Sequence, residues 1–124
     1  MIVDDDERNR NLARDVLRAA DLRTIEAASG GEGIALAIER LPDVVLLDLR
    51  LPDMDGTDVA RNLRNGAETA AIPVVALTAI AADEGGEWLS AAGFAGYLQK
   101  PINVREFPTQ VRRYCAMPAP EPAT

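Results

Sequence analysis

The 124-residue sequence contains no histidine, a single cysteine and few aromatic residues. Without histidine, the chain cannot provide an imidazole metal ligand, a Ser-His or Cys-His nucleophile pair, or a phosphohistidine. Cys115 alone cannot form an internal disulfide, which is typical of proteins from a reducing compartment. Polar chemistry on this chain must therefore come from carboxylates, hydroxyls, lysine and arginine.

Long hydrophobic runs and a positive charge balance are also lacking. The net charge is −7, and no basic stripe with interleaved aromatic residues is present, which argues against direct DNA binding. The apolar runs are far shorter than the roughly 20 residues of a membrane-spanning helix. No basic-then-apolar leader opens the sequence. We therefore expect a cytoplasmic protein that contacts neither DNA nor membranes.

Short apolar strands and helical stripes alternate along the chain, which predicts a parallel sheet with helices on both faces. We expect one domain over residues 1–117 and a proline-rich, mobile tail over 118–124. The strands are expected at 1–3, 24–27, 44–47, 74–77 and 96–98. Helical patterns are expected from about 7, around 34–41, over 58–64 and 87–92, and from Val104 to Tyr114 with Pro108 near the first turn.

Polar side chains stand where these strands end. The uninterrupted apolar run at 44–47 reads as a strand buried on both faces, and it stops at Asp48. A charged carboxylate there is costly unless another group pairs with it. Parallel strands bring their carboxyl ends to one edge, so the other polar strand ends should converge on Asp48. These are Asp4 and Asp5 after the first strand, Thr78 after the fourth and Lys100 after the fifth.

This combination of groups suits phosphoryl transfer. Clustered carboxylates repel one another, and Mg2+ resolves the repulsion because it favours carboxylate oxygens, a carbonyl and retained waters. A lysine ammonium and a threonine hydroxyl supply charge neutralisation and positioning for a phosphoryl group. An aspartate nucleophile at such a site would form an acyl phosphate.

Four segments in order carry a family resemblance: "IVDDD", "VVLLDLRLPDMDG", "IPVVALTA" and "GYLQKPI". From residue 1 to about 117 the chain resembles a response-regulator receiver domain of the CheY-like superfamily. The resemblance implies an α/β, flavodoxin-like (βα)5 fold, a doubly wound parallel sheet with strand order 2-1-3-4-5. In the stretch "IPVVALTAIA" and in its lack of an output domain, the chain is most similar to stand-alone, DivK-like regulators of cell-cycle or polarity signalling.

The resemblance assigns roles around the acidic cluster. It makes Asp48 the phosphoacceptor, with Asp5 binding Mg2+ directly and Asp4 binding it through water. The backbone carbonyl of Arg50 would be another metal ligand. Arg50 and Ile80, each two residues beyond a site residue, would border the phosphoryl group.

Further roles follow at the ends of the fourth and fifth strands. Thr78 would hydrogen-bond the phosphoryl group, and Lys100 would pair with one of its oxygens. The peptide bond between Lys100 and Pro101 would be cis. Tyr97 would swing inward when Thr78 moves. The phosphodonor would be a sensor histidine kinase or a histidine phosphotransfer protein. The output would pass to a downstream protein target through the face of the fourth helix, fifth strand and fifth helix.

Other interpretations stay open for these residues. Asp48 could cap a turn, the acids after the first strand could cap a helix as we expect of Asp6, and Tyr97 could be a core tyrosine. Trp88 could belong either to a partner surface or to the core. The whole domain could also be a constitutive interaction module that is never phosphorylated.

A second motif points to a different chemistry. Residues 53–57 spell the DxDGT nucleophile motif of haloacid-dehalogenase-like phosphatases. That motif must begin directly at the end of a buried strand, whereas Pro52 and Arg50 separate Asp53 from the strand here. We therefore interpret Asp53, with Asp43, Asp55 and Asp58, as a turn or helix-cap residue.

Receivers also usually have more apolar residues before the first acids than the three present here, so we expect an altered first strand.

Overall fold

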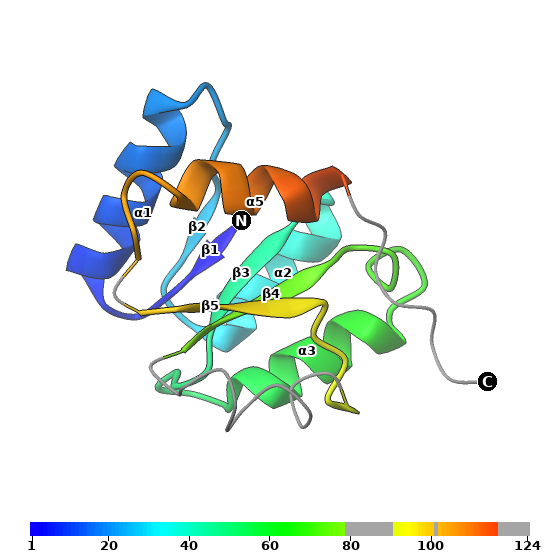
Figure 1. Cartoon of the computed structure of the whole chain (residues 1–124). Helices are drawn as coiled ribbons and strands as arrows, with labels where there is room; N and C mark the ends of the chain where they lie inside the picture. The colour runs from blue at the N-terminus through cyan, green and yellow to red at the C-terminus, as the bar shows by residue number, and fades with distance from the viewer. Residues whose placement is uncertain (79–90, 101, 117–124) are drawn as a thin grey trace.

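A computed structural model describes residues 1–78, 91–100 and 102–116 of the chain (Figure 1). The predictions made for Ile80, Trp88, the peptide bond before Pro101 and the tail lie outside these residues. None of the helices in the described ranges is long and apolar enough to cross a membrane.

Five parallel strands form one sheet in the order β2-β1-β3-β4-β5, which confirms the predicted fold and strand order. The strand β1 pairs with both β2 and β3, and β3 also pairs with β4. The first strand is central although only two of its residues are in the ladder. The strands are β1 (Ile2–Val3), β2 (Glu26–Ala27), β3 (Val45–Asp48), β4 (Val74–Thr78) and β5 (Gly96–Gln99).

Helices cover both faces of the sheet, as predicted. One pair packs on one face and the other pair on the opposite face (Figure 1). The first pair is α1 (Glu7–Ala19) and α5 (Phe107–Ala116), and the second is α2 (Gly30–Arg40) and α3 (Gly56–Asn65). This two-sided cover makes the fold a doubly wound α/β domain.

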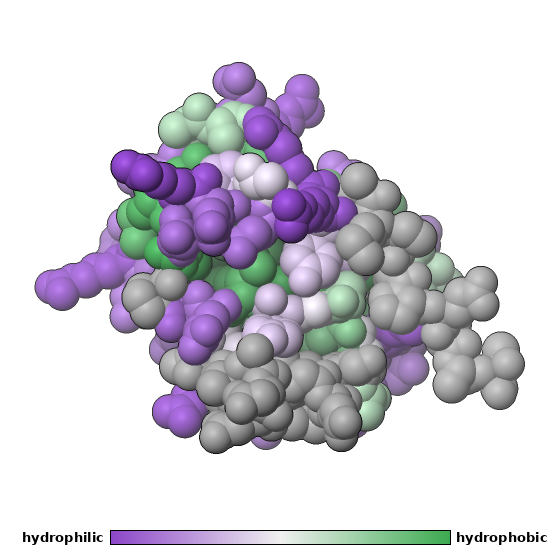
Figure 2. Space-filling view, viewed as in Figure 1, coloured by the Kyte–Doolittle hydropathy of each residue, from purple (hydrophilic) through white to green (hydrophobic). Residues whose placement is uncertain are grey.

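The core consists of two apolar layers, one on each side of the sheet. Leu46 of β3 packs in the layer under α1 and α5, whereas Val45 and Leu47 pack in the layer under α2 and α3. Burial on both sides explains why the sequence of β3 shows no polar alternation. On the face seen in Figure 2, hydrophilic side chains cover most of the coloured surface, and apolar residues show in a hollow between them.

The first helix, α1, begins where the sequence predicts, whereas the last helix, α5, begins later than predicted. Asp6 caps α1 as predicted, because its carboxylate accepts hydrogen bonds from the backbone N–H groups of Arg8 and Asn9. The last helix begins at Phe107, and Val104, predicted to lie on its apolar stripe, is 54% exposed. A helix beginning at Val104 would force the ring of Pro108 against the carbonyl four residues earlier.

Candidate functional site

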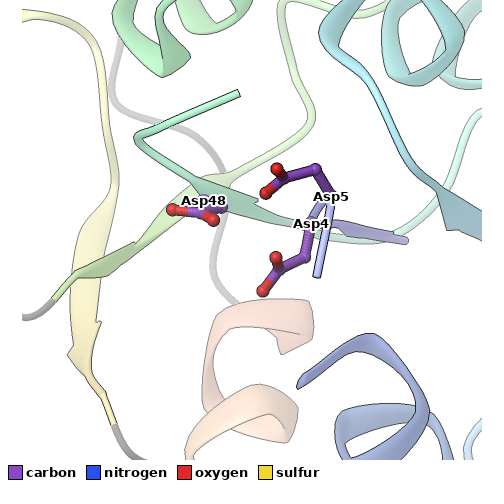
Figure 3. A group of neighbouring side chains, drawn as sticks. All are labelled: Asp4, Asp5 and Asp48. Carbon is purple, nitrogen blue, oxygen red and sulfur yellow. The ribbon is translucent and has the colours of Figure 1, made fainter. Parts of the chain in front are cut away.

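Three carboxylates meet at the carboxyl edge of the two central strands. Asp4 and Asp5 follow β1, Asp48 ends β3, and one oxygen of each lies within 4.8 Å of the others (Figure 3). The parallel pairing of Val3 with Leu47 brings them together. Asp4 is only 1% exposed and Asp48 9%, whereas Asp5 is exposed. The structure thus brings together the acids that the sequence placed at one sheet edge.

Lys100 neutralises part of this acidic cluster from the end of β5. Its Nζ lies 3.2 Å from Asp4 Oδ2 and 3.2 Å from Asp48 Oδ2. The backbone N–H of Lys100 donates to the carbonyl of Thr78, at 2.8 Å, and this bond holds the chain just after β5 beside the end of β4. Partial burial acts to lower the pKa of Lys100, but the charges of Asp4 and Asp48 outweigh it, so the pKa is raised. The lysine is therefore a cation at neutral pH.

Asp4 is the most deeply buried acid of the cluster. Burial raises its pKa above the ordinary value, and the nearby charge of Asp48 acts in the same direction. The backbone N–H of Asp6, at 2.9 Å, and the ammonium of Lys100 oppose this rise without cancelling it. Asp4 therefore favours the neutral form more strongly in the folded protein than in the unfolded chain.

Asp4→Asn is expected to raise the free energy of unfolding in Mg2+-free buffer by roughly 1 kcal/mol, a typical single-substitution effect. The amide removes the buried charge and still accepts from Asp6. The folded state holds the Asp4 proton more tightly, so this contribution to stability is full below pH 3.8 and is lost as pH rises through the raised pKa. Urea unfolding at several pH values measures both effects. A less stable Asn variant at neutral pH would contradict them.

Thr78 and Tyr97 occupy the strands beside the cluster. Thr78 is buried at the end of β4, next to the strand that carries Asp48, and pairs in register with Gln99. Tyr97 is half-buried on β5 and packs against the apolar layer under α2 and α3. This position is compatible with both interpretations of Tyr97, the core tyrosine and the switch residue.

The backbone of Arg50 lies beside Asp48. Its N–H donates to Asp48 Oδ1 at 3.1 Å, and Arg50 forms an antiparallel bridge with Asp55. The N–H of Gly56 donates to the carbonyl of Leu49 at 3.0 Å. A Cβ at Gly56 would lie 2.8 Å from Leu49 Cα, so only glycine allows this close approach. The loop after the strand is therefore closed at its base.

Asp53, the first residue of the phosphatase-like motif, lies outside the acidic cluster. Its carboxylate accepts hydrogen bonds from the backbone N–H groups of Gly30 and Gly31, at 2.8 and 2.9 Å, at the start of α2. These two bonds lower the pKa of Asp53. Sequence reasoning described Asp53 as a turn or cap residue but did not identify the helix that it caps, because that helix lies earlier in the chain.

Comparison with known proteins identifies the family. The family model for the response regulator receiver domain matches residues 1–112. The polar-differentiation response regulator DivK of Brucella ovis is 39% identical over 114 residues, which cover 92% of this chain and 93% of DivK. The chain therefore belongs to the response regulator receiver domain family, whose members take part in two-component signalling.

Solved structures agree with this assignment. The chemotaxis response regulator CheY4 of Vibrio cholerae is 27% identical and has a TM-score of 0.85, covering 91% of this chain and 94% of CheY4. The receiver domain of a sensor histidine kinase from Pseudomonas aeruginosa is 29% identical and has a TM-score of 0.83. That match covers 94% of this chain and 95% of the receiver, whose structure has a magnesium ion coordinated in the active site cleft.

Proposed function

We propose that this chain accepts a phosphoryl group on Asp48 from a phosphohistidine of a sensor histidine kinase or a histidine phosphotransfer protein. The observation that carries the proposal is the placement of the Asp48 carboxylate, held at the end of a buried strand between two other acids and Lys100. A carboxylate used only to cap a turn would not need a second buried acid and a bridging ammonium beside it.

The transfer exchanges one bond for another. A carboxylate oxygen of Asp48 forms a P–O bond while the P–N bond to the donor imidazole breaks. The imidazole nitrogen keeps the electron pair of that bond and takes up a proton. The product is an acyl phosphate on Asp48.

The acid cluster has the donor chemistry that Mg2+ prefers. Carboxylate oxygens of Asp5 and Asp48 and the backbone carbonyl of Arg50 would hold the ion, with Asp4 acting through water. A bound Mg2+ would supply positive charge against the phosphoryl oxygens. The exposure of Asp5 leaves its carboxylate accessible to an ion arriving from solvent, which supports a direct role for it.

Lys100 and Thr78 would stabilise the product. Lys100 pairs with Asp48 before the reaction, and on transfer its ammonium would move from that carboxylate to a phosphoryl oxygen. The hydroxyl of Thr78 would donate a hydrogen bond to another oxygen, and Tyr97 would follow it inward. The signal would then reach a downstream protein through β5, α5 and the helix expected over 87–92.

Asp5→Asn is expected to weaken Mg2+ binding at least about 10-fold, because one direct anionic ligand is lost from a site built of hard oxygen donors. Calorimetric titration measures the affinity. Asp6→Asn is the matched control, since Asp6 is the adjacent acid but caps α1 instead of joining the cluster. Equal Mg2+ affinity in Asp5→Asn and wild type would show that the metal ligand is misassigned.

Labelling with radioactive acetyl phosphate tests the function itself. The proposal predicts an alkali-labile label on the wild type that appears with Mg2+ and is absent when a chelator removes the ion. The second candidate function is a constitutive interaction module, and it predicts no label under either condition. A label of equal intensity with and without Mg2+ would contradict the metal-dependent mechanism.

A further inference from the structure

The first turn of α2 is completed by a residue from another part of the chain. Ser29 caps the helix conventionally, because its hydroxyl accepts from the N–H of Glu32 and its carbonyl accepts from the N–H of Gly33. The N–H groups of Gly30 and Gly31 have no acceptor within α2 itself, because the first N–H groups of any helix lack a preceding turn to bond to. Asp53 accepts from both of them, those of Gly30 and Gly31.

Apolar packing reinforces the same contact. The side chain of Met54, next to Asp53, lies over Gly30, where a Cβ would clash with Met54 Cγ and lie 2.9 Å from Val59 Cγ2. Gly30 therefore leaves the space that Met54 fills. The loop from Leu49 to Asp55 is joined to α2 by two hydrogen bonds and one packed side chain.

The loop that Asp53 anchors is the one that borders the phosphoacceptor. Its base is closed by the Arg50–Asp55 bridge and by the bond from Gly56 to Leu49. Its first segment holds Asp48 directly, through the N–H of Arg50. The tip of the loop, at Asp53, is thus fixed to α2 while its base is fixed to the strand that ends in Asp48.

We propose that Asp53 is a positioning residue, whose two bonds to α2 hold the backbone of Arg50 in place beside Asp48. The carboxylate does not enter the site and acts only through the loop. Its relevance to Mg2+ and to phosphoryl transfer rests on the function proposed above, whereas its effect on the loop does not. The DxDGT-like motif at 53–57 then reflects loop anchoring, with no phosphatase chemistry.

Three variants separate anchoring from charge. Asp53→Ala removes both acceptors and the charge, whereas Asp53→Asn removes the charge but keeps one carbonyl acceptor. Asp58→Ala is the charge-matched control, because Asp58 is a half-buried acid of the first turn of α3 that pairs with Arg61. Amide hydrogen exchange of Arg50 and Gly56 in Mg2+-free protein reports on the loop without any activity. Mg2+ affinity from calorimetry reports on the site.

In Asp53→Ala we expect the Arg50 and Gly56 amides to exchange about 10-fold faster and Mg2+ to bind about 10-fold more weakly, the scale of a lost helix cap. Asp53→Asn should recover part of both losses, and Asp58→Ala should match the wild type.

Two results would overturn the proposal. One is faster exchange at the start of α2 with unchanged Arg50 and Gly56 amides, which would make Asp53 a cap for α2 alone. The other is equal loss of Mg2+ affinity in all three variants, which would make the effect one of charge. Failure of the proposed function is recognised separately, as a wild type that takes up no label.

Discussion

Asp48→Asn is expected to abolish labelling by acetyl phosphate. The amide has nearly the same shape as the carboxylate and can still accept from the N–H of Arg50, so the local backbone is preserved. Its oxygen, however, is not an anionic nucleophile and cannot form a stable acyl phosphate. Incorporated phosphate per mole of protein, measured with Mg2+ present, should fall to the background of the unlabelled control.

Asp43→Asn is the appropriate comparison for this loss. Asp43 is an exposed acid that precedes β3, at the opposite end of the strand from Asp48. The comparison variant should take up as much label as the wild type. An Asp48→Asn protein that unfolds like the wild type and still takes up a full label would show that another residue accepts the phosphoryl group.

Phe107→Ala is expected to lower the free energy of unfolding by about 3–5 kcal/mol, the range for a fully buried aromatic residue. Phe107 is 0% exposed and lies in the apolar layer under α1 and α5 with Leu46 and Leu98. Small domains are stable by only about 5–15 kcal/mol, so this loss is a large part of the total. Urea unfolding followed by circular dichroism measures it.

Val104→Ala supplies the contrast, because the sequence pattern gave both residues to one helical stripe. Val104 lies before α5 and is exposed, so its truncation should change stability by less than about 0.5 kcal/mol. Similar losses in Phe107→Ala and Val104→Ala would contradict the helix start at Phe107. The two variants therefore test the start of α5, where pattern and structure differ.

The sheet was predictable because its signals are local. Residues 44–47 and 74–77 form apolar runs, and Pro42 and Pro73 mark where the chain leaves the preceding segments. Parallel pairing then fixes the functional edge, since strands that run the same way end on the same side. The grouping of Asp4, Asp48 and Lys100 followed from that geometry, although the bridging of both acids by Lys100 did not.

Features that depend on partners distant in sequence were not predictable. The strand expected over 24–27 is reduced to Glu26–Ala27, because β1 offers only Ile2 and Val3 as pairing partners. The bonds from Asp53 to α2 cross between two separate segments, and no periodicity in either segment records them. Such contacts are set by how the elements pack, which a single sequence does not display.

Locating the phosphoryl group on the wild-type chain shows directly whether Asp48 is the phosphoacceptor. The protein is incubated with acetyl phosphate and Mg2+, and borohydride then reduces any acyl phosphate to an alcohol, which converts aspartate into homoserine. Peptide mass spectrometry identifies the altered residue. Homoserine is expected at position 48 and nowhere else. Homoserine at another aspartate, or its absence from a labelled protein, would contradict the assignment of Asp48.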